Sequence, residues 1–115
     1  MLRKIAEELE IDLSETTWMV DKQIVKKLGT DTAVLFAELL QRLDYPDRIC
    51  IPMSSKEIEA TTGIKRKQQE RIKRVLVQEG LIKISKFGLP RVMHFTFDED
   101  CLSRYQQLIL NSAKE

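Results

Sequence analysis

The fold of this 115-residue chain is decided by residues 54–97, which read SSKEIEATTGIKRKQQERIKRVLVQEGLIKISKFGLPRVMHFTF. Ser54 is followed three residues later by Glu57, the spacing of a capping box, in which each side chain bonds the other residue's backbone N–H. A short helix is therefore predicted to begin here, with Ile58 on its apolar side. Gly63 is predicted to end that helix, because glycine readily adopts the left-handed conformation that often follows a last turn.

A second helix is predicted from Lys65 to about Glu79, with Gly80 ending it. Ile72, Val75 and Leu76 are spaced three or four residues apart, so they share one face of the helix and are expected to pack on the core. In this register the opposite face presents Lys65, Lys67, Gln68 and Arg71.

A β-hairpin is predicted to follow. Residues 81–86 are rich in β-branched side chains, residues 87–90 read FGLP and indicate a turn, and residues 92–97 alternate as a returning strand. In such a fold residues 49–51 would form a small strand that pairs with the hairpin, and Pro52 would end it at the edge of the sheet.

The positive charge is concentrated in the same stretch. Residues 54–93 contain ten Lys or Arg and four Glu, a net charge of +6, although the whole chain carries only +1 and the remainder therefore −5. Six of the cations lie between Lys65 and Arg74, in the first turns of the second predicted helix. A recognition helix meets the major groove of DNA with these turns.

Short motifs flank this helix. TGI at 62–64 and EGLI at 79–82 resemble the winged helix-turn-helix pattern. Upstream, IVKKLG at 24–29 and AVL at 33–35 are similar to the amino-terminal domains of phage and plasmid replication initiators, the replisome organisers. FGLP at 87–90 resembles the Gly-x-Pro wing tip of that group.

The resemblance covers about residues 18–97 and implies a DNA-binding winged helix with a role in replication. Those initiators usually continue into a helicase-loading or second domain, whereas this sequence stops at Glu115. Gln68 could pair bidentately with adenine and Arg71 with guanine, and the wing would lie on the backbone or in the minor groove. The DNA-binding residues expected are Lys65, Arg66, Lys67, Gln68, Arg71, Arg74, Lys86 and Arg91.

A length of 115 residues fits one domain, 1–115, and the composition is typical of a globular protein. The helical stripes and the single β-rich stretch 81–97 predict an α+β, mostly helical fold, and the resemblance puts its winged core at about 18–97. No apolar run approaches the ~20 residues of a membrane span, and Glu7, Glu8 and Glu10 interrupt any signal-peptide pattern. Cys50 and Cys101 are far apart, so we expect buried, reduced thiols and a cytoplasmic location.

The amino-terminal residues predict an amphipathic helix at about 2–10, with Leu2, Ile5 and Leu9 on one side. Five acids lie within residues 7–15 and would be repelled by phosphate, so this segment should lie away from nucleic acid. Trp18, the only tryptophan, is expected to anchor the core.

Two central helices are predicted. The first begins near Lys22 and closes at Gly29. Asp31 is a plausible N-cap for the second, which extends from Thr32 to about Asp44. Because this second helix is apolar on most sides, we expect it at the centre of the fold or partly covered by a partner.

A carboxyl-terminal helix is predicted at about 99–111. The three acids at residues 98–100 support its start, because the positive end of the helix dipole stabilises negative side chains there. Its apolar stripe comprises Leu102, Tyr105, Leu108 and Ile109. Exposed stripes of this kind usually find a partner. We expect either a homodimer through the terminal helices or packing of both helices on their own core.

No catalytic or metal signature is present: His94 is the only histidine, and no HExxH, GxSxG or phosphate-binding glycine motif occurs. We therefore expect no enzymatic activity, cofactor or metal. The expected partners are double-stranded DNA, replication proteins and a second copy, without a membrane. The alternatives are a transcriptional regulator of the same fold and an interaction module that does not bind nucleic acid.

Overall fold

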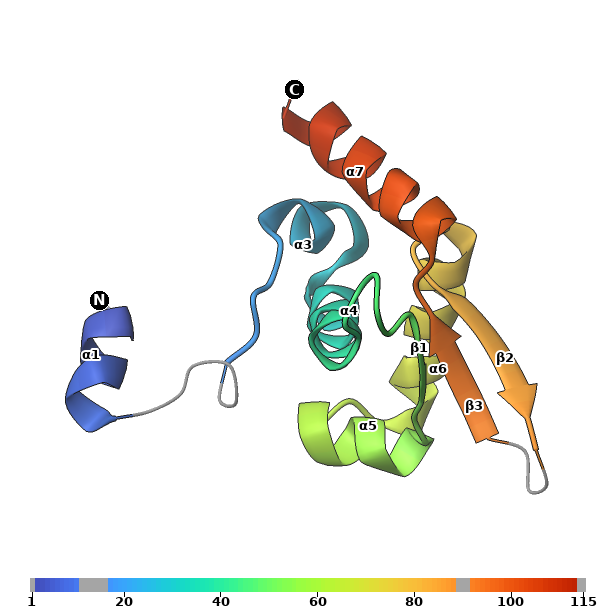
Figure 1. Ribbon diagram of the computed structural model, residues 1–115, viewed down its shortest axis with the longest axis horizontal. Coiled ribbons are helices and arrows are strands. Elements are labelled where there is room, and N and C mark those ends of the chain that lie inside the picture. The colour runs from blue at the N-terminus through green and yellow to red at the C-terminus, as the bar shows by residue number, and fades with distance from the viewer. Residues whose placement is uncertain (1, 11–16, 89–91, 114–115) are drawn as a thin grey trace.

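The computed structural model describes residues 2–10, 17–88 and 92–113 (Figure 1). The chain is α+β and mostly helical, with one small antiparallel sheet, which confirms that part of the prediction. The elements, in order, are α1 (Leu2–Leu9), α3 (Lys22–Leu28), α4 (Thr30–Arg42), β1 (Cys50–Pro52), α5 (Ser55–Thr62), α6 (Arg66–Gln78), β2 (Lys83–Phe87), β3 (Val92–Thr96) and α7 (Glu99–Ala113). None of the helices in these ranges is long and apolar enough to span a bilayer.

The three strands lie in the order β1-β3-β2, and both pairings are antiparallel. The predicted short strand is present and pairs with the hairpin, Ile51 lying opposite Phe95. The predicted strand 81–86 is displaced: Leu81 and Ile82 are buried in the core before β2 begins, because these two side chains fill the junction between α6 and the sheet. Residues 89–91, at the predicted wing tip, lie outside the described residues.

The helices α5 and α6 begin and end close to the predicted positions. Ser54 and Glu57 form the capping box, with the Glu57 N–H donating to Ser54 Oγ at 3.1 Å. Gly63 ends α5 in the left-handed region at φ 76°. Three residues then separate α5 from α6.

One cap prediction is wrong. Gly29, at φ 98°, both ends α3 and precedes α4, so α4 begins at Thr30 and Asp31 lies inside its first turn. Asp31 still gains from the helix dipole there. The cap that sequence reasoning missed is Asp21, whose carboxylate accepts from the N–H of Gln23 at 2.7 Å and of Ile24 at 3.3 Å, at the start of α3.

Helix α4 is the centre of the core. It packs against α3, α5 and α6, and seven of its residues are buried. The ring of Phe36 lies 6.2 Å from that of Phe97 and 5.5 Å from that of Tyr105, so α4 also meets the end of the sheet and α7. The apolar circumference of this helix is therefore covered largely by the chain itself.

Two predictions of burial are wrong. Trp18 is 37% exposed and covers the side of α4, where its indole N–H donates to Glu38 Oε2 at 2.7 Å. Glu38 also accepts from Arg42 Nε at 2.7 Å. Trp18 therefore belongs to a polar cluster with Glu38 and Arg42 and is not a core anchor. Cys50 is exposed because side chains alternate along β1 and Ile51 takes the inward position, whereas Cys101 is buried, which raises the pKa of its thiol.

The apolar stripe of α7 packs on the chain's own core. Leu108 is 5% exposed, and Leu102 and Tyr105 pack against the same cluster. Tyr105 donates to Asp21 Oδ2 at 3.1 Å, and burial together with that carboxylate raises its pKa to about 12. Of the predicted dimer surface, Leu108 is thus used within the chain and Leu102, Tyr105 and Ile109 are half-buried. The homodimer itself stays a prediction.

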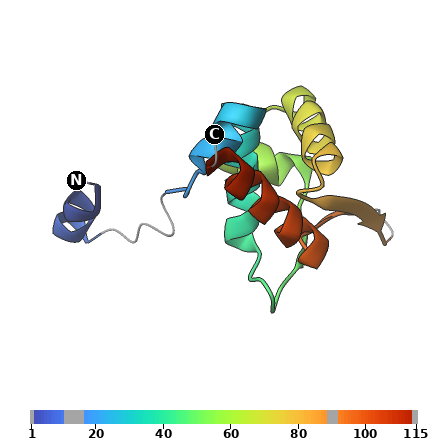
Figure 2. The same cartoon turned by 90° about the horizontal axis from the view of Figure 1, so that it is seen from above.

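Helix α1 lies apart from the rest of the chain in two perpendicular views (Figures 1 and 2). Ile5 is 41% exposed and Leu9 is 62% exposed. The amphipathic helix predicted at the amino terminus is therefore present, with these two apolar side chains facing solvent.

We predict that Leu108→Ala lowers the free energy of unfolding by about 2–5 kcal/mol, as expected for a large apolar side chain removed from a core. Leu110→Ala, at the same helix but 61% exposed, is the matched control and should change it by less than about 0.5 kcal/mol. Urea unfolding at several protein concentrations measures both. A cost for Leu108→Ala that depends on protein concentration would place this residue in a subunit contact instead.

Candidate nucleic-acid interface

Helix α6 has a buried face and a cationic face. Gln69, Ile72 and Leu76 are fully buried. About half a turn away, at 100° per residue, lies a row of exposed side chains: Lys67, Arg71, Arg74 and Gln78. The expected outward residues Lys65, Arg66 and Gln68 are exposed as well. Val75 is only half-buried, because the buried face is centred on Leu76 and Gln69 and not on Val75.

The orientation of α6 is set by Gln69, which sequence reasoning missed. Its side-chain amide donates to the backbone carbonyls of Ile64 at 2.8 Å and Ser55 at 3.1 Å. The Ser55 hydroxyl donates to the Gln69 side-chain carbonyl at 2.7 Å. One buried side chain therefore ties the start of α5 and the connecting turn to the first turn of α6. The predicted register already placed Gln68 outward, and Gln69 lies three residues before Ile72 on the buried face, but the partners of its amide had no sequence signal.

Two further hydrogen bonds order the turn before α6 and the start of that helix. The Lys65 N–H donates to Gln68 Oε1 at 3.2 Å, which satisfies one of the free N–H groups at the helix start. This contact uses the oxygen of the exposed Gln68 amide and leaves its NH₂ group facing outward. Thr62 Oγ1 accepts from the N–H of the buried Ile64 at 3.1 Å, which orders the turn.

Arg71 lies beside the first turn of α4. Its guanidinium is 3.8 Å from a carboxylate oxygen of Asp31, and both side chains are about half exposed. An exposed pair of this kind contributes at most about 1 kcal/mol. The ion pair with Asp31 is therefore weak, and a stronger acceptor can replace the Asp31 carboxylate as the partner of Arg71.

The hairpin lies beside α6 and contributes Lys86, which is exposed. Arg91, also expected at DNA, lies outside the described residues. Lys83, on the same strand as Lys86, does not join this surface. It donates to Asp98 at 2.6 Å and to Asp100 at 3.3 Å, and this hydrogen bond lowers the pKa of Asp98 to about 2.

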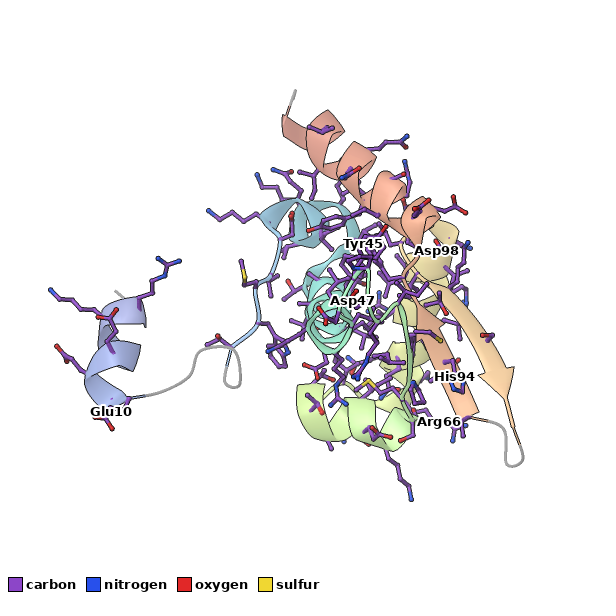
Figure 3. The ribbon with its side chains drawn as sticks, viewed as in Figure 1. Glu10, Tyr45, Asp47, Arg66, His94 and Asp98 are labelled. Carbon is purple, nitrogen blue, oxygen red and sulfur yellow. The ribbon has the colours of Figure 1, made fainter. Side chains whose placement is uncertain are left out.

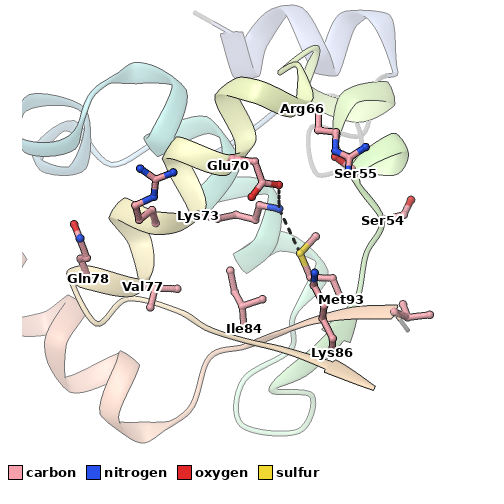
Figure 4. Close-up of a pocket in the computed structure, with 12 residues that line it drawn as sticks. Ser54, Ser55, Arg66, Glu70, Lys73, Val77, Gln78, Ile84, Lys86 and Met93 are labelled. Atoms are coloured by element: carbon pink, nitrogen blue, oxygen red, sulfur yellow. Dashed lines mark hydrogen bonds and ion pairs between the residues drawn. The ribbon is translucent and has the colours of Figure 1, made fainter. Parts of the chain in front are cut away.

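Between α6 and the hairpin lies a groove of about 710 Å³ (Figure 4). Val77 from α6 and Ile84 from β2 lie on its two sides, with Arg66 toward α5. Within it Lys73 donates to Glu70 at 2.8 Å and contacts Met93 Sδ at 3.5 Å, and the hydrogen bond lowers the pKa of Glu70. Lys73 is thus paired and nearly buried, so it adds less to the outer charge than the sequence suggested.

The groove runs along the length of α6, from Arg66 at its start to Gln78 at its end. Figure 3 shows Arg66 and His94 close to the same end of the sheet, whereas Asp98 lies toward its other end. His94, expected to be structural, has Nδ1 3.0 Å from the Val92 carbonyl oxygen. The structure thus brings Arg66, Lys73, Arg74 and Lys86 to one groove, whereas Lys67 and Arg71 lie outside it, with Arg71 beside Asp31 of α4.

We predict that Gln69→Leu lowers the free energy of unfolding by about 1–3 kcal/mol, because it roughly keeps the volume but removes the donor to the buried Ile64 carbonyl and both contacts with the part-buried Ser55. Gln78→Leu, on the exposed row of the same helix, is the control and should change it by less than about 0.5 kcal/mol. Denaturant unfolding measures both. Equal stability of the two variants would show that the amide contacts do not hold the turn.

Comparisons with known protein families, with curated proteins and with solved structures found no match to this chain.

Proposed function

We propose that this chain is a winged helix-turn-helix module that binds double-stranded DNA, with α6 as the recognition helix and the β2–β3 hairpin as the wing. The order helix, strand, two helices joined by a short turn, and hairpin corresponds here to α4, β1, α5, α6, β2 and β3. The motifs that resemble winged helix-turn-helix proteins, TGI at 62–64 and EGLI at 79–82, flank α6.

The observation that carries the proposal is the exposed row on α6. Lys67, Arg71 and Arg74 are cationic, lie within two turns of one another and are directed away from the buried Gln69–Leu76 face. A helix 13 residues long is about 20 Å in length and fits the major groove. Gln69 fixes this helix against α5, so the row is presented on a rigid element.

Each side chain has a role that its chemistry permits. Arg71 can exchange the exposed Asp31 carboxylate for the O6 and N7 acceptors of guanine. Gln68 keeps its NH₂ group available for a base acceptor. Lys86, Lys67 and Arg74 are suited to phosphate oxygens, which set affinity and register but do not read sequence.

The replication role in this proposal rests on the resemblance of residues 24–35 and 87–90 to phage and plasmid initiators. Transcriptional regulation would use the same surface, so the DNA contacts proposed here hold for both. The competing function is an interaction module without nucleic acid. Duplex affinity that falls steeply with salt favours DNA binding, and an interaction module predicts little retention on duplex.

We predict that Arg71→Ala costs about 1–3 kcal/mol of binding free energy on a duplex selected from a random pool, and relaxes selectivity at one position. Lys86→Ala should weaken binding to selected and scrambled duplexes alike, and it should reduce the salt slope by roughly one unit. Titrations against both duplexes at two salt concentrations separate the two effects.

Lys22→Ala is the matched control, since Lys22 is an exposed cation at the start of α3, next to Asp21, which bonds Tyr105 of α7. It should leave both the affinity and the salt slope close to those of the unaltered chain. Unchanged binding in the Arg71 and Lys86 variants, with folding intact, would remove this face from the mechanism. A loss in the Lys22 variant equal to that in the Lys86 variant would indicate nonspecific attraction by net charge.

A further inference from the structure

Helix α1 carries an apolar surface that the rest of the described chain leaves uncovered. Leu9 and Ile5 face solvent, and α1 is eight residues long. An isolated helix of this length is marginal in water, because the nucleation cost is not offset by so few hydrogen bonds. Stable helix formation at this position therefore calls for a surface on which Ile5 and Leu9 can be buried.

The groove between α6 and the hairpin has the complementary chemistry. Its apolar lining includes Val77 and Val92, which are 45% and 38% exposed. Four cations also line the groove: Arg66, Lys73, Arg74 and Lys86. Its one carboxylate, Glu70, is paired with Lys73. The groove thus combines four apolar side chains with polar ones, and its charged residues give it a net charge of +3.

The amino-terminal arm, residues 1–17, contains five acids against Arg3 and Lys4 on α1, a net charge of −3, whereas the groove is net positive. Residues 7–15 contain five acids and no Lys or Arg, and Glu7, Glu8 and Glu10 are exposed. An amphipathic helix that lays its apolar side chains into a groove is a common mode of recognition. At about 12 Å, α1 is shorter than the roughly 20 Å of α6 that forms one wall.

We propose that α1 of one copy docks in the groove between α6 and the hairpin of a second copy, and that the second copy returns its own α1 in the same way. The occupant is a second copy because α1 lies on the opposite side of its own chain from the groove (Figures 1 and 2). Glu10, just after α1, is correspondingly far from Arg66 (Figure 3). Trp18, held by Glu38, fixes the point from which the arm leaves.

Reciprocal docking has a physical advantage over docking of one arm. A single eight-residue helix buries little area, whereas a two-fold exchange doubles it and makes the second contact intramolecular. The acids of the arm would also cover Arg66, Arg74 and Lys86. This consequence rests on the proposed DNA binding: the exchanged dimer and the duplex would compete for the same cations.

Sedimentation equilibrium of the whole chain without DNA tests the docking directly. The unaltered chain is expected to dimerise at micromolar concentration. Leu9→Asp, on the arm, and Val77→Asp, in the groove, should each abolish the dimer, and the helical signal lost in circular dichroism should not exceed that of the eight residues of α1. Leu110→Asp is the matched control for Leu9→Asp, since Leu110 is 61% exposed and lies outside the groove, and it should remain dimeric.

Mixing the two monomeric variants distinguishes exchange from any other dimer. Leu9→Asp keeps an intact groove and Val77→Asp keeps an intact arm, so the mixture should form a heterodimer, weaker than the unaltered dimer, through one arm and one groove. Glu8→Arg and Arg74→Glu should each weaken the dimer at least tenfold, and their combination in one chain should restore part of it.

A chain that stays monomeric at 100 μM or above, about a hundred times the expected concentration, would overturn the proposal. A dimer unaffected by Leu9→Asp, or a mixture of variants that stays monomeric, would also overturn it. If the exchange holds and the unaltered chain binds duplex, Leu9→Asp should raise duplex affinity at concentrations where the chain is dimeric. An exchanged dimer with no duplex binding in any variant would reject the proposed function and retain the docking.

Discussion

The amide of Gln69 is the contact on which the rest of this structure depends. It is fully buried, and it bonds the carbonyls of Ser55 and Ile64 and the hydroxyl of Ser55 at once. A buried amide with this many partners fixes geometry, because any shift of α5 against α6 leaves polar groups unsatisfied in a low-dielectric interior. The angle at which α6 presents Lys67, Arg71 and Arg74 is therefore set from the opposite face of the same helix.

Local signals were sufficient for most helix boundaries. Capping chemistry located the start of α5, and glycine located the ends of α3 and α5, because these positions have backbone requirements that one or two residues satisfy. The buried character of α4 was equally readable, since its apolar residues surround the helix. The start of α4 was missed, because the glycine that ends α3 also precedes the next helix and no residue is left to serve as a separate cap.

For the candidate site, the sequence predicted which face of α6 is exposed, but not which of its charged side chains would be paired within the chain. Periodicity identified Lys67 and Arg71 as outward residues, but it could not tell that Lys73 would pair with Glu70 or Lys83 with Asp98. Such pairs depend on tertiary proximity, as do the hydrogen-bond partners of Gln69. The apolar stripe of α7 illustrates the same limit, because it matched a subunit contact and the chain's own core equally well until Tyr105 was placed against Phe36.

The central claim is that α6 and the hairpin form the surface that meets duplex DNA. Titration of the ¹⁵N-labelled chain with a selected duplex, followed through backbone amide shifts, tests it residue by residue. We expect the largest changes at residues 65–78 and 83–88, with little change in α3 and the distal turns of α7. Changes centred on α3 or α7, or no change at saturating duplex in low salt, would contradict the account.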